Sequence, residues 1–281
     1  MIRNLLFIIN HPLGRLDRLG ALVRLFRWQI GSRILGQPVV MDWLHSTKLV
    51  VETGMTGATG NLYCGLHEFV DMSFLLHFLR SEDGFVDIGA NVGSYSILAS
   101  GVVGAATRAF EPHPETFKKL ERNLAANSVG ERAKAYRSAV GQKEGRLKFT
   151  DDLDTMNQVV HPDYKGSSID VNVAQLDTLL NGFDSILWKI DVEGFESEVI
   201  AGARDQLKRH KPKAILLETV DNNLAQLLHE NGFEQVWYDP FGRVFGEKSN
   251  GGNNSLWVCD VDFCLKRVSS APRFEVFGLG C

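Results

Sequence analysis

The sequence has no long hydrophobic run, and its few cysteines are widely separated. The longest early apolar run, residues 5–9, is too short for a signal-peptide core and far too short to cross a bilayer. We therefore expect neither secretion nor membrane insertion, but a cytoplasmic protein. The four cysteines are Cys64, Cys259, Cys264 and Cys281, and the nearest two have neither CxxC nor zinc-site spacing. We interpret them as reduced thiols.

The main part of the chain also lacks a basic stripe. The net charge is −4, yet residues 1–36 hold six arginines and one acid, so this segment carries +5 and the remainder −9. Long nucleic acids need clustered lysine and arginine for their phosphates, and we do not expect them as the principal substrate. Hydrophobic residues make up 44% of the 281 residues and charged residues 23%, which indicates a globular protein with a substantial core.

Apolar residues recur at helical spacing near the N-terminus, with arginines between them. They are Leu16, Leu19, Val23, Phe26 and Ile30. This stripe predicts an amphipathic helix over residues 16–34. Three partners could cover it: the main domain, a second subunit of a homo-oligomer, or anionic lipid at a membrane surface. We divide the chain into an N-terminal basic helical extension, residues 1–62, and a main domain, residues 63–281.

Short apolar segments alternate with helical segments through the main domain. Strands are predicted at residues 84–89, 107–112, 134–141, 185–194 and 213–220, and helices at 115–127, 196–207 and 222–230. This alternation predicts a mostly parallel sheet, seven-stranded with its edge, and helices on both faces. Residues 236–238 and 255–259 would form an antiparallel edge hairpin. Such sheets bind ligands beyond the carboxyl ends of their strands.

The turn after the strand at 84–89 lacks the glycine pattern of a dinucleotide site. It has Gly89, Asn91 and Gly93, so the middle glycine of GxGxxG is missing, and no GK[ST] phosphate loop follows. Asp87 would repel a pyrophosphate there, which argues against a nicotinamide-dependent dehydrogenase. Glu111 ends the next strand, where doubly wound folds bind ribose hydroxyls. S-adenosylmethionine, a cationic nucleoside without phosphate, suits both acids. The alternatives are a helix N-cap for Asp87 and a surface acid for Glu111.

Several segments resemble successive motifs of the FkbM-type methyltransferase family. They are FVDIGANVGSYSILAS, AFEPHPETFKKLERNLAAN, SAVG and LWKIDVEGFESEVIAGA, with YCGLHEFVDMSFLLHFL upstream and NGGNNSLWV near the end. The resemblance covers nearly the whole chain, and the DxGANxG turn with the KxDVEGxE segment is its most specific part. It implies a Rossmann-like class I methyltransferase fold and an S-adenosylmethionine-dependent enzyme. Members of the family mostly methylate oxygen atoms of sugars and natural products, so the resemblance implies an O-methyltransferase.

The same resemblance implies roles for individual residues in cofactor binding. Asp87, Gly89, Asn91 and Gly93 would hold the methionine part, Glu111 the ribose, and Ser138 with Ala139 would border the adenine. Glu68, in the family's G-x-x-E element, would meet the cofactor's ammonium or the substrate. We expect Asp191 to be a further cofactor contact. The chain has Asn157 and Gln158 where the family pattern has Asn-His.

A hydroxyl acceptor needs a base within hydrogen-bond reach, and charged residues alternate in KIDVEGFE. A period of two places Lys189, Asp191 and Glu193 on one face of a central strand. We expect Asp191 as base or acceptor ligand, Lys189 as its electrostatic partner, and Glu193 as a cofactor or acceptor contact. The alternative is a structural ion pair of Lys189 with Asp191. His67 is a second candidate base, or a core or surface histidine.

The acceptor site is predicted around the polar insertion at residues 141–175, a loop over the mouth of the sheet. Asn157, His161 and Tyr164 could contact a sugar ring there, or the segment could be a solvated β-hairpin. Glu218 could bind sugar hydroxyls or only cap the next helix. We expect no metal, although Asp191, Glu193 and Glu218 could supply oxygen ligands.

The sequence has no DPPY or NPPY tetrapeptide, which many amino-directed methyltransferases carry, and this favours oxygen over nitrogen as the acceptor atom. The alternatives are an N-methyltransferase and a catalytically silent scaffold that binds partners through the N-terminal helix. The acceptor is expected to be a small molecule or a glycan.

Overall fold

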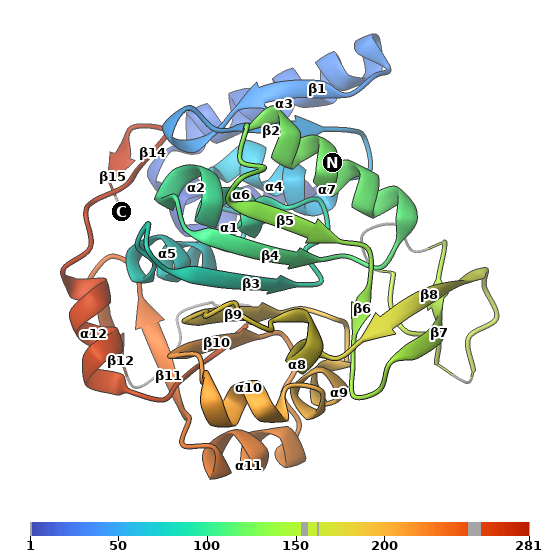
Figure 1. The fold of residues 1–281 in the computed structure, drawn as a ribbon. Helices are drawn as coiled ribbons and strands as arrows, with labels where there is room; N and C mark the ends of the chain where they lie inside the picture. The colour runs from blue at the N-terminus through green and yellow to red at the C-terminus, as the bar shows by residue number, and fades with distance from the viewer. Residues whose placement is uncertain (1, 153–156, 162, 247–253, 281) are drawn as a thin grey trace.

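The computed structural model describes residues 2–152, 157–161, 163–246 and 254–280. Its centre is an eight-stranded sheet with the strand order β12-β11-β13-β10-β9-β3-β4-β5, covered by helices on both faces (Figure 1). The strands are β3 (Gly84–Ile88), β4 (Ala106–Phe110), β5 (Ala133–Tyr136), β9 (Leu187–Ile190), β10 (Ala214–Leu217), β11 (Glu234–Asp239), β12 (Val244–Gly246) and β13 (Ser255–Val258).

The predicted Rossmann-like architecture is confirmed, with one strand more than the seven expected. Strands β5, β4, β3, β9 and β10 pair in parallel, whereas β13 is antiparallel to both β10 and β11. The additional strand is the three-residue β12, which pairs with β11 and forms the edge of the sheet. The turn predicted between β11 and β13 falls partly on residues 247–253, outside the described residues.

Alternation along the central strands divides the core between the two faces of the sheet. Phe85, Leu187 and Leu216 pack with helices α5 (Phe69–Phe78), α7 (Pro114–Ala126) and α12 (Val261–Ser269) and the π-helical turn η2 (Leu98–Val103). Val86, Trp188 and Ile215 pack with α8 (Leu176–Leu179), α9 (Glu196–Ala201), α10 (Arg204–Arg209) and α11 (Asn222–Glu230). The single helix predicted at 196–207 is two helices, because α9 ends where Gly202 packs closely against the backbone of Gly141.

The strand order reverses beside β3, since the chain runs from β3 to β4 and β5 on one side and returns as β9 on the other. Ligands of open α/β sheets bind at such a switch point, beyond the carboxyl ends of the strands. Asp87 lies near the end of β3 and Gly89 directly follows that strand, whereas Lys189 lies near the end of β9 and Asp191 directly follows it. The topology therefore brings the candidate residues of two distant segments together.

The predicted insertion forms a second, three-stranded sheet with the order β6-β8-β7, at the right of Figure 1. Its strands are β6 (Ala139–Val140), β7 (Gly145–Thr150) and β8 (Ser168–Ala174), and β7 and β8 form an antiparallel hairpin. His113, the N-cap of α7, lies 2.8 Å from the Asp151 carboxylate through Nε2 and so ties the end of β7 to the main body.

The N-terminal segment contains α1 (Ile2–Asn10), α2 (Pro12–Leu16), α3 (Arg18–Leu35), the strands β1 (Val39–Asp42) and β2 (Lys48–Val51), and α4 (Thr56–Cys64). Its residues Ile8, Leu13 and Leu25 belong to the same core cluster as the main domain. Helix α4 crosses the predicted boundary at residue 62. That division of the chain stays a prediction.

Most of the predicted helix at 16–34 is α3, which begins at Arg18, whereas Leu16 belongs to α2; the predicted apolar stripe does not pack on the main domain. All five residues of the stripe are at least 47% exposed, whereas Ala21, Leu25 and Trp28 on another face are buried. Among the described residues no helix has the length and apolarity needed to span a bilayer. Cys64, Cys259 and Cys264 are free thiols, and Cys281 lies outside the described residues.

Candidate active site

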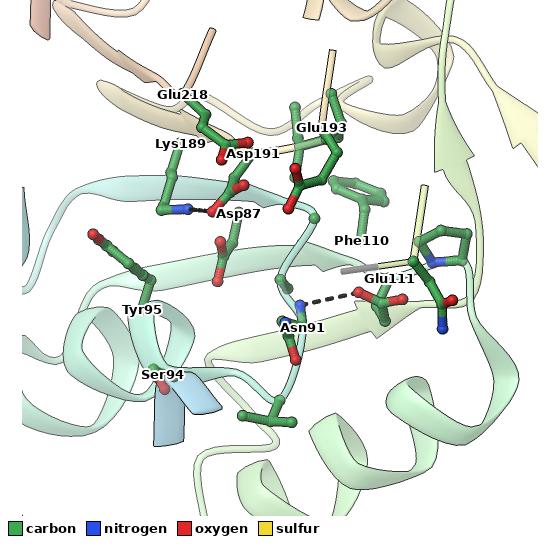
Figure 2. Close-up of a pocket in the computed structure, with 18 of the residues that line it drawn as sticks. Asp87, Asn91, Ser94, Tyr95, Phe110, Glu111, Lys189, Asp191, Glu193 and Glu218 are labelled. Carbon is green, nitrogen blue, oxygen red and sulfur yellow. Dashed lines mark hydrogen bonds and ion pairs between the residues drawn. The ribbon is translucent and has the colours of Figure 1, made fainter. Parts of the chain in front are cut away.

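A cavity of about 250 Å³ opens at the carboxyl ends of β3, β4, β9 and β10 (Figure 2). It collects most of the predicted residues: His67, Glu68, Asp87, Gly89, Asn91, Glu111, Ser138, Ala139, Asn157, Lys189, Asp191, Glu193 and Glu218. Gly93 lies just behind the lining, at the start of helix α6 (Ser94–Ile97). His161 and Tyr164 do not line the cavity.

The turn after β3 depends on glycine and asparagine for its backbone. Gly89, Asn91 and Gly93 have φ angles of 76°, 52° and 90°, in the left-handed region that these two residue types tolerate best. A side chain on Gly89 would also overlap the carbonyl oxygen of Asp191. Glycine thus lets the ends of β3 and β9 approach each other, and the turn forms one wall of the cavity.

Glu111 is buried at the end of β4 and is held by two backbone amides. The amides of Asn91 and His113 donate to its two carboxylate oxygens at 3.0 and 2.9 Å. Burial raises the pKa of Glu111 to about 7, although these two hydrogen bonds oppose the rise. The alternative of a surface acid is wrong, since the residue is 6% exposed. Its remaining lone pairs can accept from the hydroxyls of a ligand.

Asp87 is buried at the end of β3 and accepts a hydrogen bond from Ser96 Oγ at 2.6 Å. Burial raises its pKa to about 6, and the ammonium of Lys189 works against this rise. The alternative of a helix N-cap is wrong, because Gly93 occupies the N-cap position of α6. The carboxylate faces the cavity beside the cationic end of Lys189 (Figure 2).

Lys189 and Asp191 form an ion pair at the end of β9, in which Lys189 is buried and Asp191 is partly exposed. Lys189 Nζ lies 2.5 Å from Asp191 Oδ2 and 4.6 Å from the centre of the Tyr95 ring. Burial alone would lower the pKa of Lys189, but Asp191, Glu68 and Asp87 together raise it above its ordinary value. Burial would raise the pKa of Asp191, yet Lys189 and a hydrogen bond with Glu218 hold it below its ordinary value.

Three carboxyl groups meet on the wall opposite Glu111. Oxygens of Asp191, Glu193 and Glu218 lie within 4.8 Å of one another (Figure 2). Burial, together with the neighbouring Asp191, raises the pKa of Glu218 to about 8. The alternative that Glu218 caps the next helix is wrong, because Asp221 caps α11. The group could also hold a cation, and the expected absence of a metal stays a prediction.

Two residues that the sequence did not single out support this arrangement. Tyr95 Oη donates to Glu68 Oε2 at 2.6 Å, which joins Glu68 to the Lys189 ion pair through the Tyr95 ring. Asn61, fully buried on α4, donates to Ser94 Oγ at 3.0 Å and accepts from the amide of His67 at 2.6 Å. Tyr95 lies in the segment FVDIGANVGSYSILAS, but neither its position nor that of Asn61 follows a sequence pattern that predicts a site residue.

The remaining predicted residues are divided between the cavity and the surface. His67 lines the cavity, and burial lowers its pKa, so the imidazole is neutral near pH 7. Asn157 lines it from the insertion and accepts from Thr150 Oγ1 at 3.0 Å. The side chain of His161 is 79% exposed and lies 3.7 Å from the Asp163 carboxylate. Tyr164 lies half-buried within the insertion.

The charges of the lining fit a cationic nucleoside. Among the described residues, the cavity lining contains six acids and a single lysine. The acids are Glu68, Asp87, Glu111, Asp191, Glu193 and Glu218. Such a lining attracts a sulfonium and an ammonium and repels a pyrophosphate. The residues present therefore fit S-adenosylmethionine, with Asp87 and Glu111 on opposite sides of the glycine turn.

A sequence model described as the methyltransferase FkbM domain matches residues 87–234, from Asp87 to the start of β11. The chain belongs to the FkbM methyltransferase family. Methyltransferase sdnD of Sordaria araneosa is 26% identical over 59% of this chain and 79% of its own length. Methyltransferase 1 of Beauveria bassiana (strain ARSEF 2860) is 26% identical over 49% of this chain and 65% of its own length.

Solved structures overlap this FkbM methyltransferase only loosely. Precorrin-6y C5,15-methyltransferase from Geobacter metallireducens has 15% identity and a TM-score of 0.40 over 69% of this chain and 87% of its own. P. horikoshii TYW2 in complex with MeSAdo has 13% identity and a TM-score of 0.38 over 87% of this chain and 83% of its own. Family membership makes the chain an S-adenosylmethionine-dependent methyltransferase, as the motifs predicted.

Proposed function

We propose that this FkbM methyltransferase transfers a methyl group to a hydroxyl of a sugar, a glycan or a related natural product. The observation that carries the proposal is the group of carboxyl oxygens of Asp191, Glu193 and Glu218, which lie within 4.8 Å of one another on the cavity wall, with Lys189 paired to Asp191. A hydroxyl is a weak nucleophile until its proton is removed, so a proton acceptor in this place suits such an acceptor.

The cofactor would lie along the glycine turn, with Glu111 on the ribose hydroxyls and Ser138 and Ala139 beside the adenine. Asp87 and Glu68 would face the cationic methionine end, and Asn91 and Gly93 shape the turn that receives it. Bound S-adenosylmethionine supplies an activated methyl group on a sulfonium. The chain's own task is then to hold a hydroxyl in line with that methyl group and keep water away.

We assign the proton transfer to Glu218, with Asp191 as its partner. Lys189 keeps Asp191 ionised and so makes it a weak base, whereas the raised pKa of Glu218 makes its carboxylate a stronger one. The deprotonated pair can take the proton of the acceptor hydroxyl. Glu193 and Asn157 line the same side and would hydrogen-bond neighbouring hydroxyls of a sugar ring.

Methyl transfer in solution tests this proposal. The purified chain would be incubated with methyl-labelled S-adenosylmethionine and a panel of oligosaccharides, nucleotide-activated sugars and amine acceptors, with and without a chelator, and the products located by fragmentation mass spectrometry. We expect a methyl ether on a hydroxyl, unaffected by the chelator and lost in Glu218→Gln. Glu198→Gln, which removes an exposed acid of α9 from outside the cavity, should retain activity.

A methyl group found on nitrogen would overturn the choice of acceptor atom. Full activity of Glu218→Gln would overturn the assignment of the base. No transfer to any acceptor, despite cofactor binding, would favour a scaffold.

A further inference from the structure

The outer face of α3 is apolar along its whole length and has no partner within the described chain. We call it the α3 face. It consists of Leu19, Val23, Phe26, Ile30 and Ile34, which are 47–77% exposed. Their steps of three and four residues place them on one side of a helix of 18 residues, about 27 Å long. A contiguous apolar face of this kind marks an interaction surface.

The helix is held to the body by its other side. Arg24 turns inward, where its Nε donates to Tyr63 O at 2.9 Å and its Nη1 to Asp17 at 2.9 Å. Ala21, Leu25 and Trp28 are buried in the core. The exposed apolar side chains therefore belong to a helix that is firmly packed through its inner face. In Figure 1, α3 runs along the outer rim, at the end opposite α11.

The charged residues of α3 itself are all basic. Arg18, Arg27 and Arg33 are exposed on α3, and Asp17, the only acid in residues 1–36, is already bonded to Arg24. We propose that the α3 face docks on the surface of an anionic lipid bilayer. The apolar side chains would enter the boundary between headgroups and acyl chains, and the arginines would reach the lipid phosphates.

A second copy of the chain fits this surface less well than lipid does. In a two-fold dimer the same patch meets itself, so the arginines of one α3 would lie near those of the other, and α3 itself has no acid to pair them. Docking would also place the cavity close to the membrane, because α3 packs on α4, and α4 lines the cavity with Ala58 and Asn61. The inference does not depend on which acceptor is methylated.

Vesicle flotation of the full-length chain tests the proposal. The probes are vesicles of phosphatidylcholine alone and of phosphatidylcholine with one third phosphatidylglycerol. We expect flotation with the anionic vesicles only, weakening as salt is raised. Leu19→Ser/Phe26→Ser/Ile30→Ser and Arg18→Glu/Arg27→Glu should each weaken binding at least about tenfold, since each exposed arginine contributes about fivefold at such a surface.

The matched control Arg204→Glu/Arg209→Glu makes the same charge change on exposed residues of α10. It should bind like the unchanged chain, and circular dichroism would show that all variants are folded. Equal flotation with neutral vesicles, or flotation unchanged by the α3 substitutions, would overturn the proposal. A dimer that dissociates in the serine variant, together with no vesicle binding, would instead assign the α3 face to a second copy.

Discussion

The candidate site concentrates carboxyl groups in places where a folded protein seldom buries them. Asp87 and Glu111 are almost fully buried, and burial raises the pKa of each. A carboxyl group raised in this way is more stable protonated, so it favours folding at low pH and this contribution is lost as the pH rises through about 6 to 7. Burying these two carboxyl groups therefore lowers the stability of the fold near neutral pH, but it places hydrogen-bond acceptors in the site before a ligand binds. Such a loss of stability is typical of functional sites.

Glu218 should control the pH dependence of catalysis. Its raised pKa of about 8 means that the base is protonated and inactive below that pH and becomes available above it. We expect kcat/KM to rise with pH up to about 8 and then to level off. Glu218→Gln should lower kcat by roughly a hundredfold or more and remove this limb of the profile. The measurement is a pH series of initial rates.

If the pH profile of kcat/KM for Glu218→Gln kept the rising limb with the same midpoint, this role of Glu218 would be contradicted. His67→Gln is the informative comparison, because it removes the other candidate base from the same cavity. It should leave the midpoint in place.

At the residue scale, the sequence identified the charged groups but not their pairings. The alternation in KIDVEGFE predicted that Lys189, Asp191 and Glu193 would share one edge, and the motif spacing predicted Asp87 and Glu111. Tyr95 was missed because its value lies in two contacts across the fold, with Glu68 and Lys189, which no local pattern records. His161 and Tyr164 belong to an insertion whose path is set by strand pairing rather than by local sequence.

At the scale of elements, the small sheet of the insertion forms one side of the cavity through Phe149, Asn157 and Val159. Its attachment to the main body includes the contact of Asp151 with His113, whose side chain is only 7% exposed. The insertion is thus both a β-hairpin and a part of the cavity wall, two descriptions that the sequence had treated as alternatives. The polar character of the segment could not distinguish them.

Asp151→Ala should loosen this sheet without unfolding the protein. Removing a partly exposed contact should lower the free energy of unfolding by about 1 kcal/mol or less. Hydrogen exchange of the amides in β7 and β8 should speed up severalfold, and KM for the acceptor should rise more than kcat falls. Mass spectrometry of exchange and steady-state kinetics measure these effects.

Lys148→Ala is the matched control, because it removes the exposed ion pair of Lys148 with Asp170 on the same hairpin. It should leave exchange and kinetics almost unchanged. Equal effects of the two substitutions would show that the contact with His113 has no special role.

The helix α3 illustrates what periodicity can and cannot predict about an element. The stripe at Leu19, Val23 and Phe26 correctly predicted a helix. The helix also carries a second apolar face, with Ala21, Leu25 and Trp28, and it is this face that packs on the core. A sequence cannot show which of two apolar faces meets the body, since that depends on the partner elements.

At the scale of the whole molecule, the cavity exists only when the sheet is assembled. Its lining runs from Met55 to Glu218 and includes the ends of four strands, the start of α6 and the insertion. The alternation of strands and helices predicted a parallel sheet, and the topological switch point then placed the ligand. The eighth strand was not predicted, because a three-residue strand such as β12 has no periodicity to detect.

The account depends on Asp87 and Glu111 as the acids that hold the cofactor. Isothermal titration calorimetry with S-adenosylhomocysteine tests this most directly. Asp87→Asn keeps an acceptor for Ser96, and Asp221→Asn changes an acid that caps α11 outside the cavity while preserving its capping role.

We expect the unchanged chain and Asp221→Asn to bind with equal affinity. Asp87→Asn and Glu111→Gln should each bind at least about tenfold more weakly, since a hydrogen bond to a charged group contributes about 1.5–3 kcal/mol. Unaltered affinity in both of these folded variants would contradict the central claim that the two strand-end carboxylates form the cofactor site.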